Sequence, residues 1–206
     1  MTRGQWAFAA FPPFLFVLLL ASSSPPNSSA HMCACCANAG EWAEVTRRIQ
    51  PYELNVIQDL KFAEKAQFYL SDADEPAGVQ LPSLIGEGVT TKLTRRQKQW
   101  TIRVTGHEGE TVTLTFSLPA VATFFKVDPR DGAAGDAGPM LYKEVRMGGP
   151  VRGTGIFARG NSGSTRYRLV IQSRGNNCFD GDSFKGWTLQ VRGPKADYSV
   201  YGAIAQ

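Results

Sequence analysis

Two neighbouring stretches decide the fold: Trp100-Thr101-Ile102-Arg103-Val104 and Val112-Thr113-Leu114-Thr115-Phe116. In each, apolar residues alternate with threonine or arginine, which is the pattern of a strand with one buried and one wet face. The connector Gly106-His107-Glu108-Gly109 has hairpin composition, so the two strands should be antiparallel neighbours. This clean alternation excludes a doubly wound parallel sheet, whose strands are buried on both faces.

Similar short apolar or alternating stretches recur on both sides of this hairpin. They predict further strands at Gln67–Leu70, Phe124–Val127, Leu141–Met147, Ile156–Phe157, Tyr167–Ile171, Trp187–Val191 and Tyr198–Ile204. About eight or nine strands in sequential order predict a mainly β protein, an antiparallel up-and-down β-barrel, because closure removes exposed strand edges. A two-sheet β-sandwich is the alternative.

The composition changes upstream of these strands. Glu41–Ile49 and Tyr52–Phe62 carry apolar residues at mixed spacings of three and four. This spacing predicts short N-terminal helical segments. We therefore expect a single β-rich domain over residues 31–206. A cysteine-rich terminus and the helical segments should occupy 31–65, and a β meander 66–206.

The first residues of the chain have the layout of a secretory signal peptide. Arg3 precedes an almost wholly apolar run from Ala7 to Ala21, and a small, polar segment ending at Ala30 follows. The run is shorter than the ~20 residues that a spanning helix needs. We expect residues 1–30 to be a signal peptide and the protein to be secreted or periplasmic, with no transmembrane span after cleavage. A retained membrane anchor is the alternative.

The four cysteines are Cys33, Cys35, Cys36 and Cys178. An even number in an exported protein predicts two disulfides. A bridge between the adjacent Cys35 and Cys36 is strained, so each of the remaining pairings joins the N-terminal region to Cys178. The alternative is a copper(I) or zinc site within His31–Cys36, where soft ligands gather.

The chain has 206 residues, of which 43% are apolar, and a formal net charge of +4. This composition fits one folded domain and excludes a disordered chain. Six arginines are predicted to form one basic wall: Arg95, Arg96, Arg103, Arg166, Arg168 and Arg192. Such a wall attracts acidic partners, here an acidic envelope component. Nucleic acid is not expected, because no nucleic-acid module is visible.

The sequence contains no recognisable catalytic constellation, and we expect no catalytic residues. The only histidines are His31 and His107, so catalysis that depends on histidine lacks a second partner. A hydrolase would need paired acids, such as Asp180 with Glu144 or Asp182. Asp180 and Asp182 also have the alternate spacing of calcium ligands, although a capped turn is the simpler interpretation. No cofactor is expected, with calcium as the alternative.

These observations favour an exported, non-enzymatic protein that binds a small molecule or a glycan. The candidate ligand-binding residues are Trp100, Tyr167, Trp187, Arg103 and Arg168. The aromatic candidates line a cavity if the barrel is hollow and form its core if it is filled. A filled barrel favours an interaction, inhibitor or structural module. The alternation predicts that Trp100, Leu114, Leu169 and Trp187 point inward and that Arg103, Thr113, Arg168 and Gln190 point outward.

Overall fold

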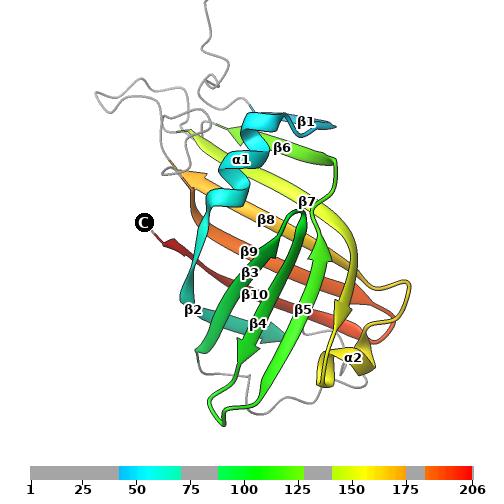
Figure 1. Cartoon of the computed structure of the whole chain (residues 1–206). Helices are drawn as coiled ribbons and strands as arrows, with labels where there is room; N and C mark the ends of the chain where they lie inside the picture. Colours follow the sequence, from blue (N-terminus) through cyan, green and yellow to red (C-terminus); the bar gives the residue numbers. More distant parts are fainter. Residues whose placement is uncertain (1–41, 71–87, 128–140, 175–183, 206) are drawn as a thin grey trace, which may run out of the picture. The chain divides into compact units, whose positions relative to one another are not determined.

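The computed structural model describes residues 42–70, 88–127, 141–174 and 184–205, which are mostly β-structure (Figure 1). The strands of this part of the chain are β1 (Trp42–Arg48), β2 (Lys61–Leu70), β3 (Val89–Arg96), β4 (Gln99–Thr105), β5 (Thr111–Ser117), β6 (Val121–Val127), β7 (Tyr142–Gly153), β8 (Arg166–Arg174), β9 (Phe184–Gly193) and β10 (Ala196–Ala205). The helices are α1 (Pro51–Asp59) and α2 (Ile156–Gly160).

Eight of these strands close into an antiparallel barrel. The order around the ring is β7-β5-β4-β3-β2-β10-β9-β8, and β8 pairs back onto β7. Apart from the closing pair β2 and β10, ring neighbours follow one another in the chain, with β6 as the insertion between β5 and β7. The predicted up-and-down barrel is therefore confirmed. The predicted antiparallel hairpin is also confirmed, because Trp100 lies opposite Phe116 and Val104 opposite Val112.

The long strand β7 holds the ring and an extra pair of strands together. One of its edges pairs with β8 from Tyr142 to Pro150. The other edge is shared, because β6 pairs with Tyr142–Arg146 and β5 pairs with Val151–Gly153. Strand β1 pairs with the far side of β6. Strands β1 and β6 thus extend the sheet outside the closed ring.

Aromatic side chains fill the barrel interior. The Phe62 ring stacks on Trp187 with centroids 4.4 Å apart and meets the edge of Trp100 at 5.9 Å. Phe116 and Tyr167 lie 4.4 Å apart. The predicted facing of the strands is confirmed: Trp100, Leu114, Leu169 and Trp187 are at most 1% exposed, and Arg103, Thr113, Arg168 and Gln190 all reach solvent.

A helix covers each end of the barrel. Helix α1 buries Ile57, and the following Leu60 is also buried, at the end where β2 begins. Helix α2 follows β7 at the opposite end and inserts Phe157, which stacks on Tyr198 at 4.7 Å. Figure 1 shows the two helices at the two ends of the ring. The described barrel is therefore packed and closed rather than an open cup.

The structure corrects three predicted elements. The helix predicted at Glu41–Ile49 is wrong, because Trp42–Arg48 is strand β1. Pairing with β6 supplies its backbone hydrogen bonds and overrides the local spacing. The predicted strand at Ile156–Phe157 is the start of helix α2. The helix predicted at Tyr52–Phe62 is confirmed as α1, but β2 already begins at Lys61, within the region expected to be helical.

Helix α1 is held to β1 by a buried carboxylate. Both carboxylate oxygens of Glu53 accept hydrogen bonds from Arg47, at 2.8 and 2.5 Å. One of them also accepts the backbone N–H of Gln50 at 2.8 Å, which completes a capping box. Burial raises the pKa of Glu53, but the hydrogen bonds from Arg47 and Gln50 outweigh it, and the pKa is lowered overall.

We expect Glu53→Gln to lower the free energy of unfolding at pH 7 by about 1 to 3 kcal/mol, because it removes a charged hydrogen-bonding partner. The lowered pKa means that this stabilisation is complete above the unfolded value near 4.5 and is lost as the pH falls through the folded value. The free energy of unfolding, measured with urea between pH 7 and 3, should therefore change less with pH in the variant than in the wild type. The control is Glu108→Gln, which changes a glutamate in an exposed turn. If the free energy of unfolding had the same slope against pH in the wild type, Glu53→Gln and Glu108→Gln, this role of Glu53 would be contradicted.

Candidate functional site

The five predicted ligand-binding residues lie on two sides of the sheet. Trp100, Tyr167 and Trp187 are in the packed core. The Tyr167 hydroxyl donates to the carbonyl of Ser117 at 2.6 Å, and burial raises the pKa of this phenol. Arg103 and Arg168 are exposed on the outside of β4 and β8. The structure therefore does not gather these five side chains around one cavity.

The predicted single basic wall is wrong, because its arginines lie on opposite sides of the ring. Arg96 and Arg103 belong to β3 and β4, whereas Arg166 and Arg168 belong to β8. Strands β5 and β7 separate β4 from β8 in one direction, and four strands separate them in the other. Alternation along a strand fixes inside against outside but not the position around the ring.

Arg95 points inward and serves the packing of α1. Its guanidinium donates to the carbonyl of Leu60, just beyond the last turn of the helix, and lies 4.8 Å from the centre of the Trp100 ring. Burial lowers the pKa of Arg95, and the nearby Asp59 partly offsets this effect. These contacts remove Arg95 from any outer surface that could meet a ligand.

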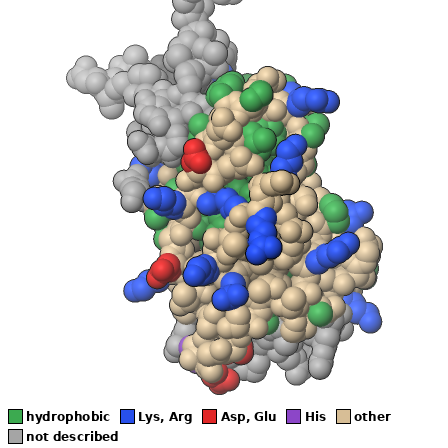
Figure 2. Space-filling view, in the orientation of Figure 1, with side chains coloured by type: hydrophobic (Ala, Val, Ile, Leu, Met, Phe, Trp, Pro, Cys, Tyr) green, Lys and Arg blue, Asp and Glu red, His purple; other side chains and the backbone are tan. Residues whose placement is uncertain are grey.

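A continuous surface of threonines and cations covers the outside of β3, β4, β5 and the end of β7. We call it the threonine-basic face. Its side chains are Thr90, Lys92, Thr94, Arg96, Gln99, Thr101, Arg103, Thr105, Thr111, Thr113, Thr115, Ser117 and Arg152. Strands β3, β4 and β5 contain no aspartate or glutamate. Figure 2 shows several Lys and Arg side chains over these strands, with acidic side chains only toward the margins.

The strand register sets these side chains in rows across the sheet. Lys92 lies opposite Arg103, which lies opposite Thr113. The next row contains Thr101, Thr115 and Arg152. Neighbouring strands are about 4.8 Å apart, so the cations and hydroxyls of a row lie close to one another. The rows therefore form an ordered array in which positive charge is not neutralised within β3 to β5.

Hydroxyl groups within the threonine-basic face are held by one another. The Thr101 and Thr115 hydroxyls lie 3.1 Å apart, and those of Thr105 and Thr111 lie 3.2 Å apart. The Thr113 hydroxyl lies 2.8 Å from that of Thr154. Cross-strand hydrogen bonds of this kind order the side chains before a ligand arrives. The surface can therefore offer donors and acceptors in fixed positions.

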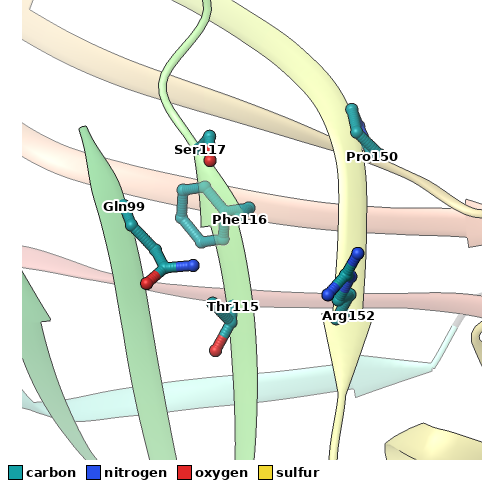
Figure 3. Close-up of a pocket in the computed structure, with 6 residues that line it drawn as sticks. All are labelled: Gln99, Thr115, Phe116, Ser117, Pro150 and Arg152. Atoms are coloured by element: carbon teal, nitrogen blue, oxygen red, sulfur yellow. The ribbon is translucent and has the colours of Figure 1, made fainter.

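A pocket of about 280 Å³ opens at the end of this face where β5 and β7 separate. It is lined by Gln99, Thr115, Phe116, Ser117, Pro150 and Arg152. Figure 3 shows the side chains of Gln99 and Arg152 on opposite sides of Thr115. A planar amide, hydroxyls and a guanidinium thus surround one concave position. Guanidinium groups bind carboxylates and sulfates in two-pronged geometry, and amides and hydroxyls bind sugar hydroxyls.

A second pocket of about 350 Å³ lies on the outside of β6, β7 and β8. It is lined by Glu44, Thr123, Arg146, Met147, Gly148 and Arg168. Arg146 is already bound to Glu44 at 2.9 Å and to Glu144 at 2.5 Å. Its charge is therefore neutralised inside the protein, which makes this pocket less suited to an anion than the threonine-basic face.

The acidic residues and cysteines named from the sequence are not brought together in one site by the described structure. Glu144 accepts from Tyr142 at 2.5 Å and pairs with Arg146 on the outside of β7. Asp180, Asp182 and the cysteines Cys33, Cys35, Cys36 and Cys178 lie outside the described residues. Within the described ranges, no group of three or more His, Cys, Asp or Glu side chains is placed to hold a metal. In the same ranges, no helix has the length and apolar character needed to cross a membrane.

No protein-family model, no curated protein and no solved structure matches. Function is therefore inferred from surface chemistry alone. The sequence analysis missed the threonine-basic face, although one signal for it was present: the outward positions of Thr111–Ser117 are all hydroxyl residues, with Thr101 and Thr105 outward on the preceding strand.

Proposed function

We propose that this protein is an exported, non-enzymatic binding protein whose ligand is an acidic glycan held on the threonine-basic face. The observation that carries the proposal is the set of exposed cations Lys92, Arg96, Arg103 and Arg152, which lie among hydroxyl side chains on strands β3 to β5, themselves without acids, and on the end of β7. Because the interior is packed and both ends are covered, we place the ligand on the outside of the barrel. A summed positive field attracts polyanions.

The chemistry of the face matches a carboxylated or sulfated sugar chain better than a neutral one. Arg103 and Lys92 can meet successive anionic groups, and Arg152 can meet another at the pocket. Threonine hydroxyls and the Gln99 amide can bind the sugar hydroxyls between them. The predicted signal peptide over residues 1–30 supports a ligand outside the cytoplasm, where such glycans occur as envelope components.

We expect the triple variant Lys92→Gln/Arg103→Gln/Arg152→Gln to weaken binding to an acidic glycan by about 3- to 150-fold, since each exposed ion pair contributes about 0.2 to 1 kcal/mol. The probes are polygalacturonate, dextran sulfate and neutral dextran, measured by titration calorimetry or retention on immobilised polymer. The wild type should bind the two acidic polymers and not dextran. Binding should weaken as salt rises from about 50 to 300 mM, because salt screens exposed charges.

The matched control is Arg168→Gln/Lys185→Gln/Arg192→Gln, which removes three positive charges from the outside of β8 and β9, away from the pocket beside Arg152. Its affinity for acidic glycan should stay within about twofold of the wild-type value, because surface charges farther apart than a Debye length of about 8 Å interact weakly. Equal losses in the two triple variants would show that net charge alone drives binding and would refute a site on the threonine-basic face. Binding of neutral dextran with equal affinity would refute the acidic ligand.

A further inference from the structure

Strand β1 is the only described strand with one edge unpaired. Its inner edge pairs with β6 along all seven residues, from Trp42 opposite Val127 to Arg48 opposite Val121. The outer edge has no neighbour among the described strands, whereas each ring strand pairs on both sides. Such an edge presents a row of backbone donors and acceptors that another strand can meet. Figure 1 shows β1 beside β6, outside the closed ring.

Exposed apolar side chains lie on β1 and on the two elements beside it. Among the described residues, six large hydrophobic side chains are exposed, and four of them lie here. Trp42 is 66% exposed and Val45 is 50% exposed on β1, Val121 lies on β6, and Tyr52 lies in the first turn of α1. Trp42 and Val121 lie on one face of the β1–β6 pair, at its two ends, and Val45 lies on the other face. The unpaired edge and the exposed Trp42 ring are therefore the two features that a partner strand would meet.

We propose that β1 pairs antiparallel with the β1 strand of a second copy of this chain, forming a two-fold symmetric dimer. Centring the pair on Val45 sets Val45 opposite its own copy and pairs all seven residues. Trp42 then faces Arg48, Ala43 faces Arg47, and Glu44 faces Thr46 across the interface. Strand addition at a sheet edge is a common mode of association, and two-fold interfaces use one patch on both partners.

The sequence of β1 is complementary to itself in this register. No two like charges lie directly opposite one another. Arg48 meets the face of the exposed Trp42 ring twice, once on each side of the axis, as a cation–π contact. Glu44, which pairs with Arg146 of its own chain, is also the diagonal neighbour of Arg48 of the second copy, within reach of its positive charge. Side chains that face each other in an antiparallel pair share one side of the sheet, so these contacts form on the same surface.

The intramolecular contacts of β1 prepare this surface. Trp42 stacks on Phe125 with ring centroids 6.3 Å apart, and the Arg146 guanidinium lies 4.7 Å from the Phe125 ring. The Thr46 hydroxyl lies 2.8 Å from that of Thr123. The Trp42 ring is thus supported on one side and open on the other. The second copy of Arg48 would occupy the open side without rearranging the strand.

The test is sedimentation velocity of the purified full chain over a wide range of protein concentrations. The wild type should form a concentration-dependent dimer. Arg48→Glu should raise its dissociation constant at least about tenfold, because it sets an acid beside Glu44 of the second copy and removes the cation facing Trp42. Glu44→Lys should also weaken the dimer. The double variant Glu44→Lys/Arg48→Glu restores opposite charges and should recover most of the affinity lost in Arg48→Glu.

The control is Arg192→Glu, which makes the same change of charge on β9, a strand separated from β1 by β6, β7 and β8. It should leave the dimer unchanged, and thermal unfolding should show that all variants are folded. A wild type that is monomeric at every concentration would refute the proposal. So would a dimer that Arg48→Glu leaves intact, or one that reductant alone abolishes, since the latter would depend on a disulfide between copies.

Discussion

Replacing Trp187 with alanine should lower the free energy of unfolding by about 3 to 5 kcal/mol, as for other fully buried tryptophans. Trp187 is 1% exposed and stacks on Phe62 at 4.4 Å with nearly parallel rings. Its indole N–H donates to the Ala203 carbonyl at 3.1 Å. The alanine variant leaves a void and loses the hydrogen bond from the indole N–H to Ala203, and both effects are destabilising.

Urea unfolding followed by far-ultraviolet circular dichroism measures this change. The control is Thr188→Ser, the next residue along β9 and on the opposite side of the sheet, which should shift stability by less than ~0.5 kcal/mol. Under conditions in which the Trp187→Ala variant is folded, it should still bind acidic glycan. A variant with wild-type stability and no glycan binding would show that Trp187 lines a ligand cavity, contrary to the packed interior.

Leu114→Ala should cost about 2 to 5 kcal/mol, the usual range for a deleted buried leucine. Leu114 is fully buried at the centre of β5, opposite Ile102 on β4 and Gly153 on β7. Such a loss is a large part of the ~5 to 15 kcal/mol that stabilises a typical domain. The effect should appear as a lower urea midpoint with an unchanged slope.

The adjacent residue provides the comparison for Leu114. Thr113 points to the outside, where its hydroxyl lies 2.8 Å from that of Thr154. Thr113→Ser keeps this hydroxyl and should cost less than ~0.5 kcal/mol. Equal shifts of the urea midpoint in Leu114→Ala and Thr113→Ser would contradict the inward and outward assignment of the two residues in β5.

Local sequence patterns were sufficient for most of the barrel strands. Alternation over a few residues depends only on which side of the sheet is buried, so Trp100, Leu114 and Trp187 could be assigned to the core directly. Strand β1 could not be recognised in this way. Its partner β6 lies more than seventy residues later, and its mostly exposed side chains show no alternation of burial. The pairing that makes it a strand is invisible to a local pattern.

The candidate site was less predictable than the fold, for a geometric reason. The sequence identifies Arg103 and Arg168 as outward residues, but their separation depends on the order of strands around the ring. That order requires the closing pair β2 and β10, together with the split edge of β7. Once it is known, the hydroxyl residues of β4 and β5 fall beside Lys92 and Arg103 rather than beside Arg168.

Ring closure by β2 and β10 also constrains when the protein can fold. Among the eight ring strands, β2 is the first to be synthesised, from Lys61, and β10 is the last, ending at Ala205. The ring therefore cannot close before β10 has been synthesised and has left the ribosome. Pairing between such distant segments is also slow, because long loops must close first. Barrel closure should thus be a late step of folding, after the local hairpins of neighbouring strands have formed.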